Sequence, residues 1–407
     1  MSNWQIVKLG ELYSVHNGLS KGRQFFGTGY PFLTFSNVFN NWFLPNELDS
    51  LVQTTDKERE ACSIKYGDVF ITRTSETMNE LGMSSVALKD YPDATYNGFT
   101  KRLRPFTDKV LPNYIGYYLR SPKFRGKFMA FSSMTTRASL ANDNLLNMEI
   151  ELPPMDVQKK IATILSRYDS LIDNYQKQIK LLEEAAQRLY KEWFVNLRFP
   201  GHENTKIVDG VPEEWEKKKI SDVCDTIGGG TPSTKVASYY EGGTIKWVTP
   251  TDITRNKSLC LLDTDKKITE EGLKHSSAKM LPAGTILMTS RASVGYFGIA
   301  DFEVCTNQGF ISCIPSSKYY QMYLLRNLMN RIEEIRIKAG GSTYLEISKS
   351  VFRNLDIICP SDKILQKFQA RANAYYMQEK NLSIQLRLLA ESRDRLLPKL
   401  LSGEIEV

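Results

Sequence analysis

The feature that most constrains this chain is a long heptad pattern near its middle, from Asp156 to Phe194. Apolar residues recur there at alternating steps of four and three for almost five heptads, which is typical of one strand of a coiled coil. The apolar positions are Ile161, Leu165, Tyr168, Ile172, Tyr175, Ile179, Leu182, Ala186, Leu189 and Trp193. The stretch contains neither Pro nor Gly, so it predicts one helix of roughly 55–60 Å. A helix with a single apolar seam needs a partner for that seam.

The rest of the chain is long enough to supply this partner, because 407 residues can form two or three domains. A hydrophobic content of 42% and a charged content of 24% are typical of a soluble protein, and we expect a cytoplasmic one without a membrane span or signal peptide. The six cysteines include no C-x-x-C pair and the three histidines lie far apart, so we expect free thiols and no metal site. A net charge of +7 permits a polyanionic partner without requiring one.

The sequence on either side of the heptad helix is duplicated at an offset of about 210 residues. Both halves open on a tryptophan, continue with a Gly-led hydrophobic strand and an Asn-containing turn, and close on a strand that ends at proline. The matched segments are Trp4–Leu12 with Trp215–Val223, Tyr66–Arg73 with Ala283–Arg291, Asn97–Phe99 with Asn307–Phe310, residues 132–139 with 339–343, and Glu149–Pro154 with Asp356–Ser361. The duplication therefore predicts two similar domains.

The second half also ends in a heptad helix. Its positions are Leu365, Phe368, Ala372, Tyr375, Glu379, Leu382, Leu386, Leu389, Arg393, Leu396 and Leu400. Glu379 and Arg393 are the polar members, and they either set the register of the helices or face a partner subunit. We expect an α+β protein in which two mixed domains, 1–155 and 199–361, alternate with helices at 156–198 and 362–407.

Two helices that each follow one copy of a domain can satisfy each other's seams by packing antiparallel as a coiled coil. The expected architecture is then a tandem duplication with pseudo-twofold symmetry, which holds two similar domains at a fixed spacing. Such a protein suits a ligand with two spaced sites. Duplex DNA is one such ligand, because half-sites on one face recur about every 34 Å.

At this point the whole chain resembles the specificity subunits of type I restriction–modification systems. The resemblance rests on the ordered, duplicated motifs: the openings at Trp4 and Trp215, the strands that lead to Thr72-Arg73 and to Ser290-Arg291, the turn at Asn307, and the C-terminal segment Leu396–Ile405. It implies a non-catalytic subunit with two target recognition domains, each reading half of a split DNA sequence. The helices would act as a spacer and dock two modification (methyltransferase) subunits, with restriction subunits joining them. The chain itself would bind no cofactor, since S-adenosylmethionine and ATP are expected on the partner subunits.

DNA-contact candidates are the cations and small polar residues at strand ends and in the matched polar loops, since Arg and Lys contact phosphates and guanine while Ser and Thr contact other base edges. The candidates are Thr72, Arg73, Thr74, Lys101, Arg102, Arg137, Ser290, Arg291, Ser293, Lys338, Ser342 and Thr343. The alternative interpretation of each is a solvated surface or a structural ion pair.

Two other functions remain as alternatives. One is a coiled-coil scaffold whose duplicated domains bind protein. The other is a stand-alone methyltransferase, suggested by the F-x-G-x-G pattern at Phe25–Gly29. An adenine methyltransferase also needs an Asn/Asp-Pro-Pro-aromatic site to hold the flipped base. The Pro-Pro pair here, Pro153-Pro154, follows Leu152 and precedes Met155, which argues against an enzyme.

Overall fold

The structure is a computed structural model that describes residues 4–75, 80–131, 138–139, 141–340 and 345–407. The chain forms two compact units. Unit 1 contains Met1–Ser170 and Leu389–Val407, and unit 2 contains Leu171–Leu388. Each unit therefore combines one globular domain with part of each long helix. This division differs from the four sequence-predicted segments because each part of a helix buries its apolar face against the domain of its own unit.

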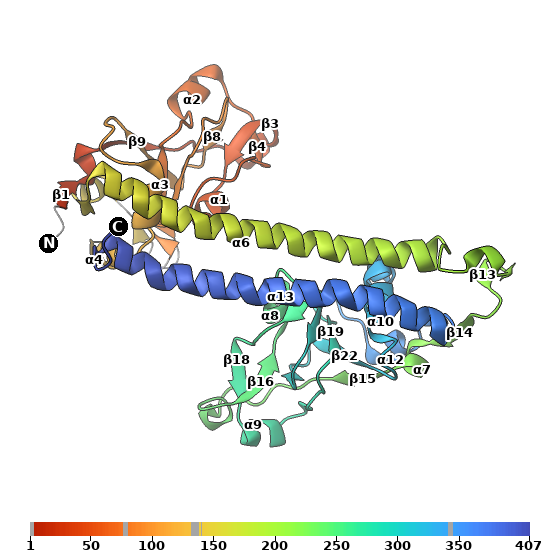
Figure 1. Cartoon of the computed structure of the whole chain (residues 1–407). Helices are drawn as coiled ribbons and strands as arrows, with labels where there is room; N and C mark the ends of the chain where they lie inside the picture. The colour runs from red at the N-terminus through yellow and green to blue at the C-terminus, as the bar shows by residue number, and fades with distance from the viewer. Residues whose placement is uncertain (1–3, 76–79, 132–137, 140, 341–344) are drawn as a thin grey trace. The chain divides into compact units, whose positions relative to one another are not determined.

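Both heptad stretches form long helices (Figure 1). Helix α6 spans Met155–Tyr190 and continues as a π-helical turn over Lys191–Val195. Helix α13 spans Asp362–Leu401. The predicted α+β class, with two similar domains and two long helices, is confirmed.

The two helices run antiparallel within each unit. In unit 1, Ile161 of α6 shares a core with Leu400 of α13. In unit 2, the rings of Trp193 and Phe368 lie 5.8 Å apart, while Ile179 and Leu386 line one cavity. As residue numbers rise along α6, the residues of α13 that it contacts have falling numbers. This is expected when two helices of similar length bury their apolar faces against each other.

Unit 1 opens with strand β1 (Gln5–Lys8), which pairs antiparallel with β11 (Glu149–Leu152) just before α6. Its main sheet has the order β2-β9-β5-β7, formed by Tyr13–Asn17, Thr100–Pro105, Val69–Thr72 and Ser84–Val86. A second sheet has the order β4-β3-β8, formed by Leu51–Val52, Phe26–Leu33 and Thr95–Tyr96. Two-residue strands β6 (Thr74–Ser75) and β10 (Ala138–Ser139) pair beside the main sheet. The helices are α1 (Phe35–Asn40), α2 (Asp56–Ala61), α3 (Pro112–Tyr118), α4 (Pro122–Phe131) and α5 (Asn142–Leu146).

Unit 2 repeats this topology with one more strand, β17 (Cys260–Leu261), at the edge of its main sheet. Strand β14 (Glu216–Lys219) pairs with β23 (Asp356–Cys359) just before α13. The main sheet has the order β15-β22-β19-β20-β17, formed by Cys224–Gly228, Phe310–Pro315, Thr285–Thr289, Phe297–Ala300 and Cys260–Leu261. The second sheet, β18-β16-β21, is formed by Lys266–Ile268, Ile245–Val248 and Cys305–Thr306. The helices are α7 (Ile220–Val223), α8 (Pro250–Thr254), α9 (Glu270–Lys274), α10 (Gln321–Asn330), α11 (Ile332–Ile337) and α12 (Lys349–Arg353).

The central strand of each main sheet is buried on both faces, which explains its continuous apolar sequence. In β5, Val69 and Ile71 face the core that includes the long helices, and Phe70 faces a second core. In β19, Ile286 likewise faces the core that includes the long helices, and Leu287 faces a second core. This alternation follows from the two-residue period of a strand.

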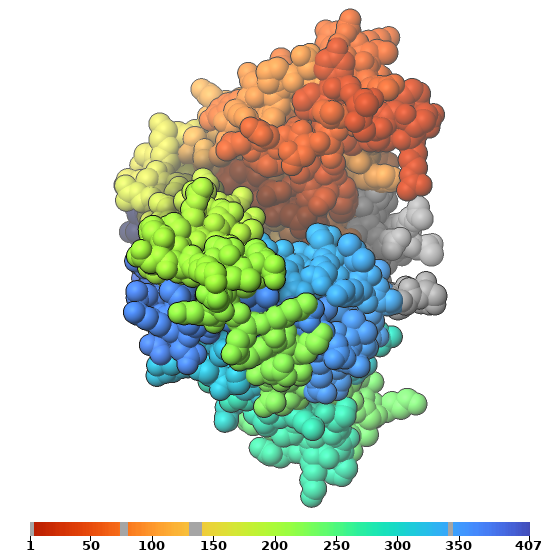
Figure 2. Space-filling view, turned by 90° about the vertical axis from the view of Figure 1, so that its right-hand side faces the viewer, coloured from red at the N-terminus to blue at the C-terminus, as the bar shows by residue number. Residues whose placement is uncertain are grey.

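A short link joins α6 to the second domain. It passes through a 3-10 turn at His202–Asn204 and a hairpin of β12 (Ile207–Val208) and β13 (Val211–Pro212). Most of this link is exposed, and the lime-green atoms of Figure 2 show it at the molecular surface.

Candidate nucleic-acid interface

Each domain gathers several of its loops at one end of its main sheet. In unit 1, β2 and β5 end where β9 and β7 begin, because neighbouring strands are antiparallel. The loops after Asn17, after Thr72 and before Thr100 therefore meet there. In unit 2, β15 and β19 end where β22 and β20 begin. We call this edge the loop end of each domain.

An Asn-led turn occupies the same place at both loop ends. Asn97 Oδ1 accepts a hydrogen bond from the Phe99 amide at 2.6 Å, and Asn307 Oδ1 accepts one from the Gly309 amide at 2.9 Å. An Asn side chain that bonds the amide two residues later stabilises such a turn locally. Each turn then accepts a backbone bond from the neighbouring loop, from Arg73 to Phe99 at 2.9 Å and from Ser290 to Gly309 at 2.8 Å.

These bonds correct the internal alignment inferred from sequence. Thr72 pairs with Thr100 across the sheet, and Thr289 pairs with Phe310. Arg73 is therefore the structural equivalent of Ser290 rather than of Arg291. Likewise, Phe99 corresponds to Gly309 and not to Phe310. The sequence match missed this one-residue offset because it aligned residue types, whereas strand register depends on backbone pairing.

Thr72 and Ser290, both predicted DNA contacts, are buried. The Thr72 hydroxyl donates to the Glu80 carbonyl at 2.6 Å and accepts from the Met83 amide at 2.9 Å. Thr289 closes the equivalent loop in unit 2. The hydroxyl of Thr72 is thus bonded to two backbone groups of its own domain, and its role as a direct DNA contact stays a prediction.

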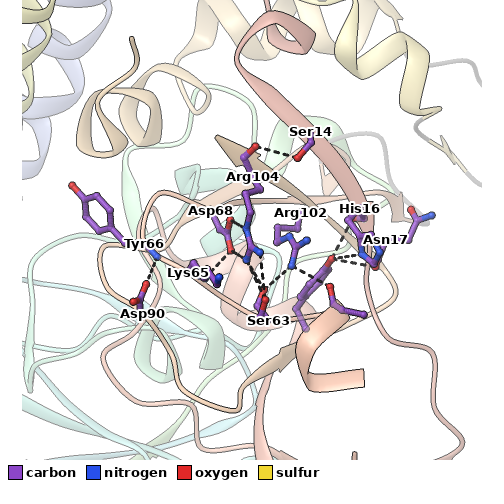
Figure 3. A network of polar contacts seen from close by, with 12 residues as sticks. Ser14, His16, Asn17, Ser63, Lys65, Tyr66, Asp68, Asp90, Arg102 and Arg104 are labelled. Atoms are coloured by element: carbon purple, nitrogen blue, oxygen red, sulfur yellow. Dashed lines mark hydrogen bonds and ion pairs between the residues drawn. The ribbon is translucent and has the colours of Figure 1, made fainter. Parts of the chain in front are cut away.

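Lys101 and Arg102, two further predicted DNA contacts, are buried on β9, which pairs with β2 on one side and β5 on the other. Arg102 Nη1 donates to the Ser63 carbonyl at 2.7 Å, next to the Arg104–Asp68 ion pair (Figure 3). Lys101 bonds the side chain of Asn142. Burial and the nearby charge of Arg73 lower the pKa of Lys101. Both cations thus bind groups of their own domain.

Four candidates do lie at the loop ends with solvent access. Arg73 is half-buried and donates to Asn17 Oδ1 at 3.4 Å. Arg291 and Ser293 are exposed, and Arg291 Nε lies 3.7 Å from a carboxylate oxygen of Glu346. Lys338 is exposed at the end of α11 and pairs with Glu334 at 3.0 Å. Long or exposed ion pairs of this kind contribute little stability, so the cations are available for phosphate.

The remaining candidates are only partly described or lie outside the described residues. Thr74 lies on β6, and its backbone pairs with that of Ser139 on β10. Arg137, Ser342 and Thr343 lie outside the described residues.

None of the fourteen predicted seam residues is exposed. Four are buried: Ile161, Leu165, Ile179 and Phe368. The others are half-buried: Tyr168, Ile172, Tyr175, Leu182, Leu189, Tyr375, Leu382, Leu386, Leu389 and Leu396. Their role as a coiled-coil seam stays a prediction.

The two polar seam residues have partners inside the chain. Arg393 donates to Asp169 at 2.7 Å, and Asp169 also accepts from the Tyr117 hydroxyl at 2.5 Å. Glu379 is 1% exposed and accepts from the Leu259 amide at 2.6 Å. Each residue therefore ties the helices to the domain of its own unit.

Two exposed turn residues were not among the sequence candidates. Phe99 is 61% exposed, and Gln308 is exposed with its Oε1 accepting from Thr231 at 2.6 Å. Both lie in the Asn-led turns that the sequence predicted. Gln308 directly follows the Asn of its turn, and Phe99 is the second residue after its Asn. This position, between the Asn and the start of a buried strand, is the signal that could have identified both residues.

The F-x-G-x-G pattern lies mostly within strand β3, where the pairing with β4 is irregular between Phe26 and Tyr30. A cofactor loop of the dinucleotide-binding kind instead joins a strand to a helix. Across the described part of the chain, no three His, Cys, Asp or Glu residues group as metal ligands would. In that same part of the chain, no helix is both long and apolar enough to cross a membrane.

Comparison with known proteins identifies this duplicated architecture. A family model described as the type I restriction modification DNA specificity domain matches residues 1–184 and again 212–391. The chain belongs to this family. Each match covers one domain and much of the long helix that follows it. The function of this non-catalytic family member is therefore DNA specificity within type I restriction–modification.

Relatives that match over nearly their whole length are also called specificity subunits. The chain is 27% identical to the type I restriction enzyme MjaIX specificity subunit of Methanocaldococcus jannaschii, covering 100% of this chain and 94% of the relative. It is 25% identical to the HindI specificity subunit of Haemophilus influenzae over the whole of both chains. The crystal structure of the type I restriction–modification S subunit from M. genitalium has a TM-score of 0.58 at 13% identity, covering 98% of this chain and 96% of that one. This last likeness concerns the fold.

Proposed function

We propose that each domain of this specificity subunit reads one half of a bipartite DNA target through its loop end. The observation that supports this most is the repetition of the loop end itself. Both copies combine a braced Asn-led turn with solvent-accessible cations, Arg73 in one and Arg291 in the other. Cations position a protein on phosphates, and rigidly held side chains can then reach base edges.

The helices have a second role in the proposal. Because each domain is tied to α6 and α13 in its own unit, the helix length would set the unread gap between half-sites. The exposed faces of the helices would dock two methyltransferase subunits, to which restriction subunits bind. S-adenosylmethionine and ATP would then be bound by these partners.

A binding assay with the chain and its modification subunit tests the proposal. The target is first obtained by sequencing methylated bases in host DNA. Labelled duplexes with the intact target, with either half-site scrambled, or with an altered gap are then compared at moderate salt, because nonspecific binding falls steeply as salt rises. We expect each alteration to weaken binding. Equal affinity for all duplexes would contradict the proposal and favour the scaffold alternative.

A further inference from the structure

The Asn-led turns at the two loop ends have equivalent backbone hydrogen bonds but different exposed side chains. In unit 2, the Asn307 amide donates to the Val248 carbonyl at 3.0 Å, while the Gly309 amide donates to Asn307 Oδ1 and the Ser290 amide donates to the Gly309 carbonyl. In unit 1, the Asn97 amide donates to the Leu33 carbonyl at 3.0 Å. Both turns are therefore fixed to both sheets of their domain.

The loop that follows the first strand of each main sheet braces the turn further. A Cβ added to Gly229 would lie 2.1 Å from the carbonyl oxygens of Thr306 and Asn307. A Cβ added to Gly18 would lie 2.2 Å from the carbonyl oxygen of Asn97. Only glycine permits these backbone approaches, so each turn has a rigid support on the side of this loop.

The rigid turns present opposite chemistry to solvent. Unit 1 has Gly98-Phe99, with the ring of Phe99 61% exposed. Unit 2 has Gln308-Gly309 at the same positions, with the Gln308 amide oriented by the hydroxyl of Thr231 at 2.6 Å. An exposed apolar ring on a fixed turn gains from an apolar contact. A fixed amide offers one free acceptor lone pair and two N–H donors.

Cations lie beside both turns. The backbone amide of Arg73 donates to the Phe99 carbonyl at 2.9 Å, and within the described residues the Arg73 guanidinium forms no ion pair. In unit 2, the exposed Lys349 approaches the glycine loop, with its Nζ 3.0 Å from where a Cβ of Gly228 would be. Such cations can fix the phosphates while the turn faces the bases.

We infer that Gln308 and Phe99 are specificity-determining residues, with Gln308 reading an adenine and Phe99 reading a thymine methyl group. A glutamine amide matches the N6 donor and N7 acceptor of adenine in the major groove. An apolar side chain matches the C5 methyl group, which distinguishes thymine there. The inference rests on the proposed function and assigns the two residues to different half-sites.

The experiment uses the chain with its modification subunit and duplexes that carry single-atom changes in the bases. Replacing adenines one at a time by 7-deazaadenine removes N7, and replacing thymines by uracil removes the methyl group. One deazaadenine position should weaken wild-type binding, while Gln308→Ala binds that duplex and the natural one alike. One uracil position in the other half-site should weaken wild-type binding roughly fourfold, and Phe99→Ala should be insensitive to it. On natural DNA we expect Gln308→Ala to lose roughly 5- to 150-fold in specific affinity.

Matched variants separate base reading from folding. Phe106 is 63% exposed beyond the opposite end of β9, and Gln5 is exposed on β1. Phe106→Ala and Gln5→Ala should leave base preference unchanged, and all four variants should unfold at the wild-type temperature. Equal weakening by a variant on every duplex, or unchanged sensitivity to the modified bases, would overturn the inference while leaving the proposed function intact. A wild-type complex without sequence preference would instead contradict the proposed function.

Discussion

At the scale of single residues, the most informative group is a carboxylate pair of unit 2, formed by the half-buried Glu183 and the buried Glu379. Glu183 of α6 hydrogen-bonds Glu379 of α13, beside the buried guanidinium of Arg326. Burial, followed by the charge of Glu379, raises the pKa of Glu183 to about 8 from 4.5. At neutral pH a proton on Glu183 therefore lets the two carboxyl groups share a hydrogen bond instead of repelling each other.

This pair predicts a pH dependence of stability. The folded chain holds a proton on Glu183 that the unfolded chain releases above pH 4.5, so stability should fall as pH rises from about 4.5 to about 8 and level off beyond. After discounting for partial exposure, we expect a loss on the order of 1–3 kcal/mol. Glu183→Gln should remove this part of the slope in thermal unfolding followed from pH 5 to 8.5. Glu184→Gln, at an exposed neighbour, should keep the wild-type slope; an unchanged slope in Glu183→Gln would contradict the assignment.

Arg291 gives a second prediction at this scale. Its side chain is 47% exposed at the loop end and only loosely paired with Glu346. If Arg291 contacts a base in addition to its proposed phosphate, Arg291→Ala should weaken binding to the specific target by roughly 1–3 kcal/mol, the range for a bidentate guanine contact. Titration of the complex with target and scrambled duplexes measures the difference. Equal weakening on both duplexes would reassign Arg291 to a phosphate.

At the scale of elements, polar residues in the helix seams connect helices to domains. Asp169 of α6 receives bonds from both Arg393 of α13 and Tyr117 of α3. The guanidinium of Arg393 also lies 5.2 Å from the ring centre of Trp42. Three helices and a loop of unit 1 thus meet at one polar network, whose members would be left unpaired if one were removed.

Removal of Arg393 should therefore destabilise unit 1. We expect Arg393→Ala to lower the free energy of unfolding by about 1–3 kcal/mol, since Asp169 loses its charged partner in a partly buried site. Arg395→Ala, at an exposed position two residues later, provides the control and should change stability by less than about 0.5 kcal/mol. Denaturant unfolding measures both. Equal effects of the two substitutions would mean that the network contributes nothing.

At the scale of the whole molecule, α6 and α13 are the elements that both units share, since each unit contains part of each helix. If they set the gap of the target, lengthening both should change it. Four residues inserted after Gln176, with four more opposite them beside Leu386, add about 6 Å of helix. That length corresponds to about two base pairs of DNA.

Sequencing of methylated sites then tests the spacer role. The half-sites should remain the same while the gap grows by about two base pairs. The same insertion after Gly201, in the exposed link, should leave the gap unchanged. Altered half-sites with an unchanged gap would contradict the spacer role.

Much of the architecture could be predicted from local patterns. The heptads predicted α6 and α13, and the repeated Trp, Gly, Asn and Pro signals predicted two copies of one domain. The site was less accessible to prediction. Arg102 was predicted from its charge as a DNA contact, yet β9 lies between β2 and β5, and the side chain of Arg102 is buried. Strand order results from pairing between distant segments, and no local pattern records it.

The sequence by itself determined the duplication, the two long helices and the family. Repeats and heptad periodicity are visible in the order of the residues, so they can be identified without knowing which residues are in contact. Only the tertiary structure decided which side chains remain at the surface. It assigned the polar residues of the helix seams, Glu379 and Arg393, to partners within the chain. It also placed Phe99 and Gln308 at the exposed turns, because burial depends on how distant strands pair and pack.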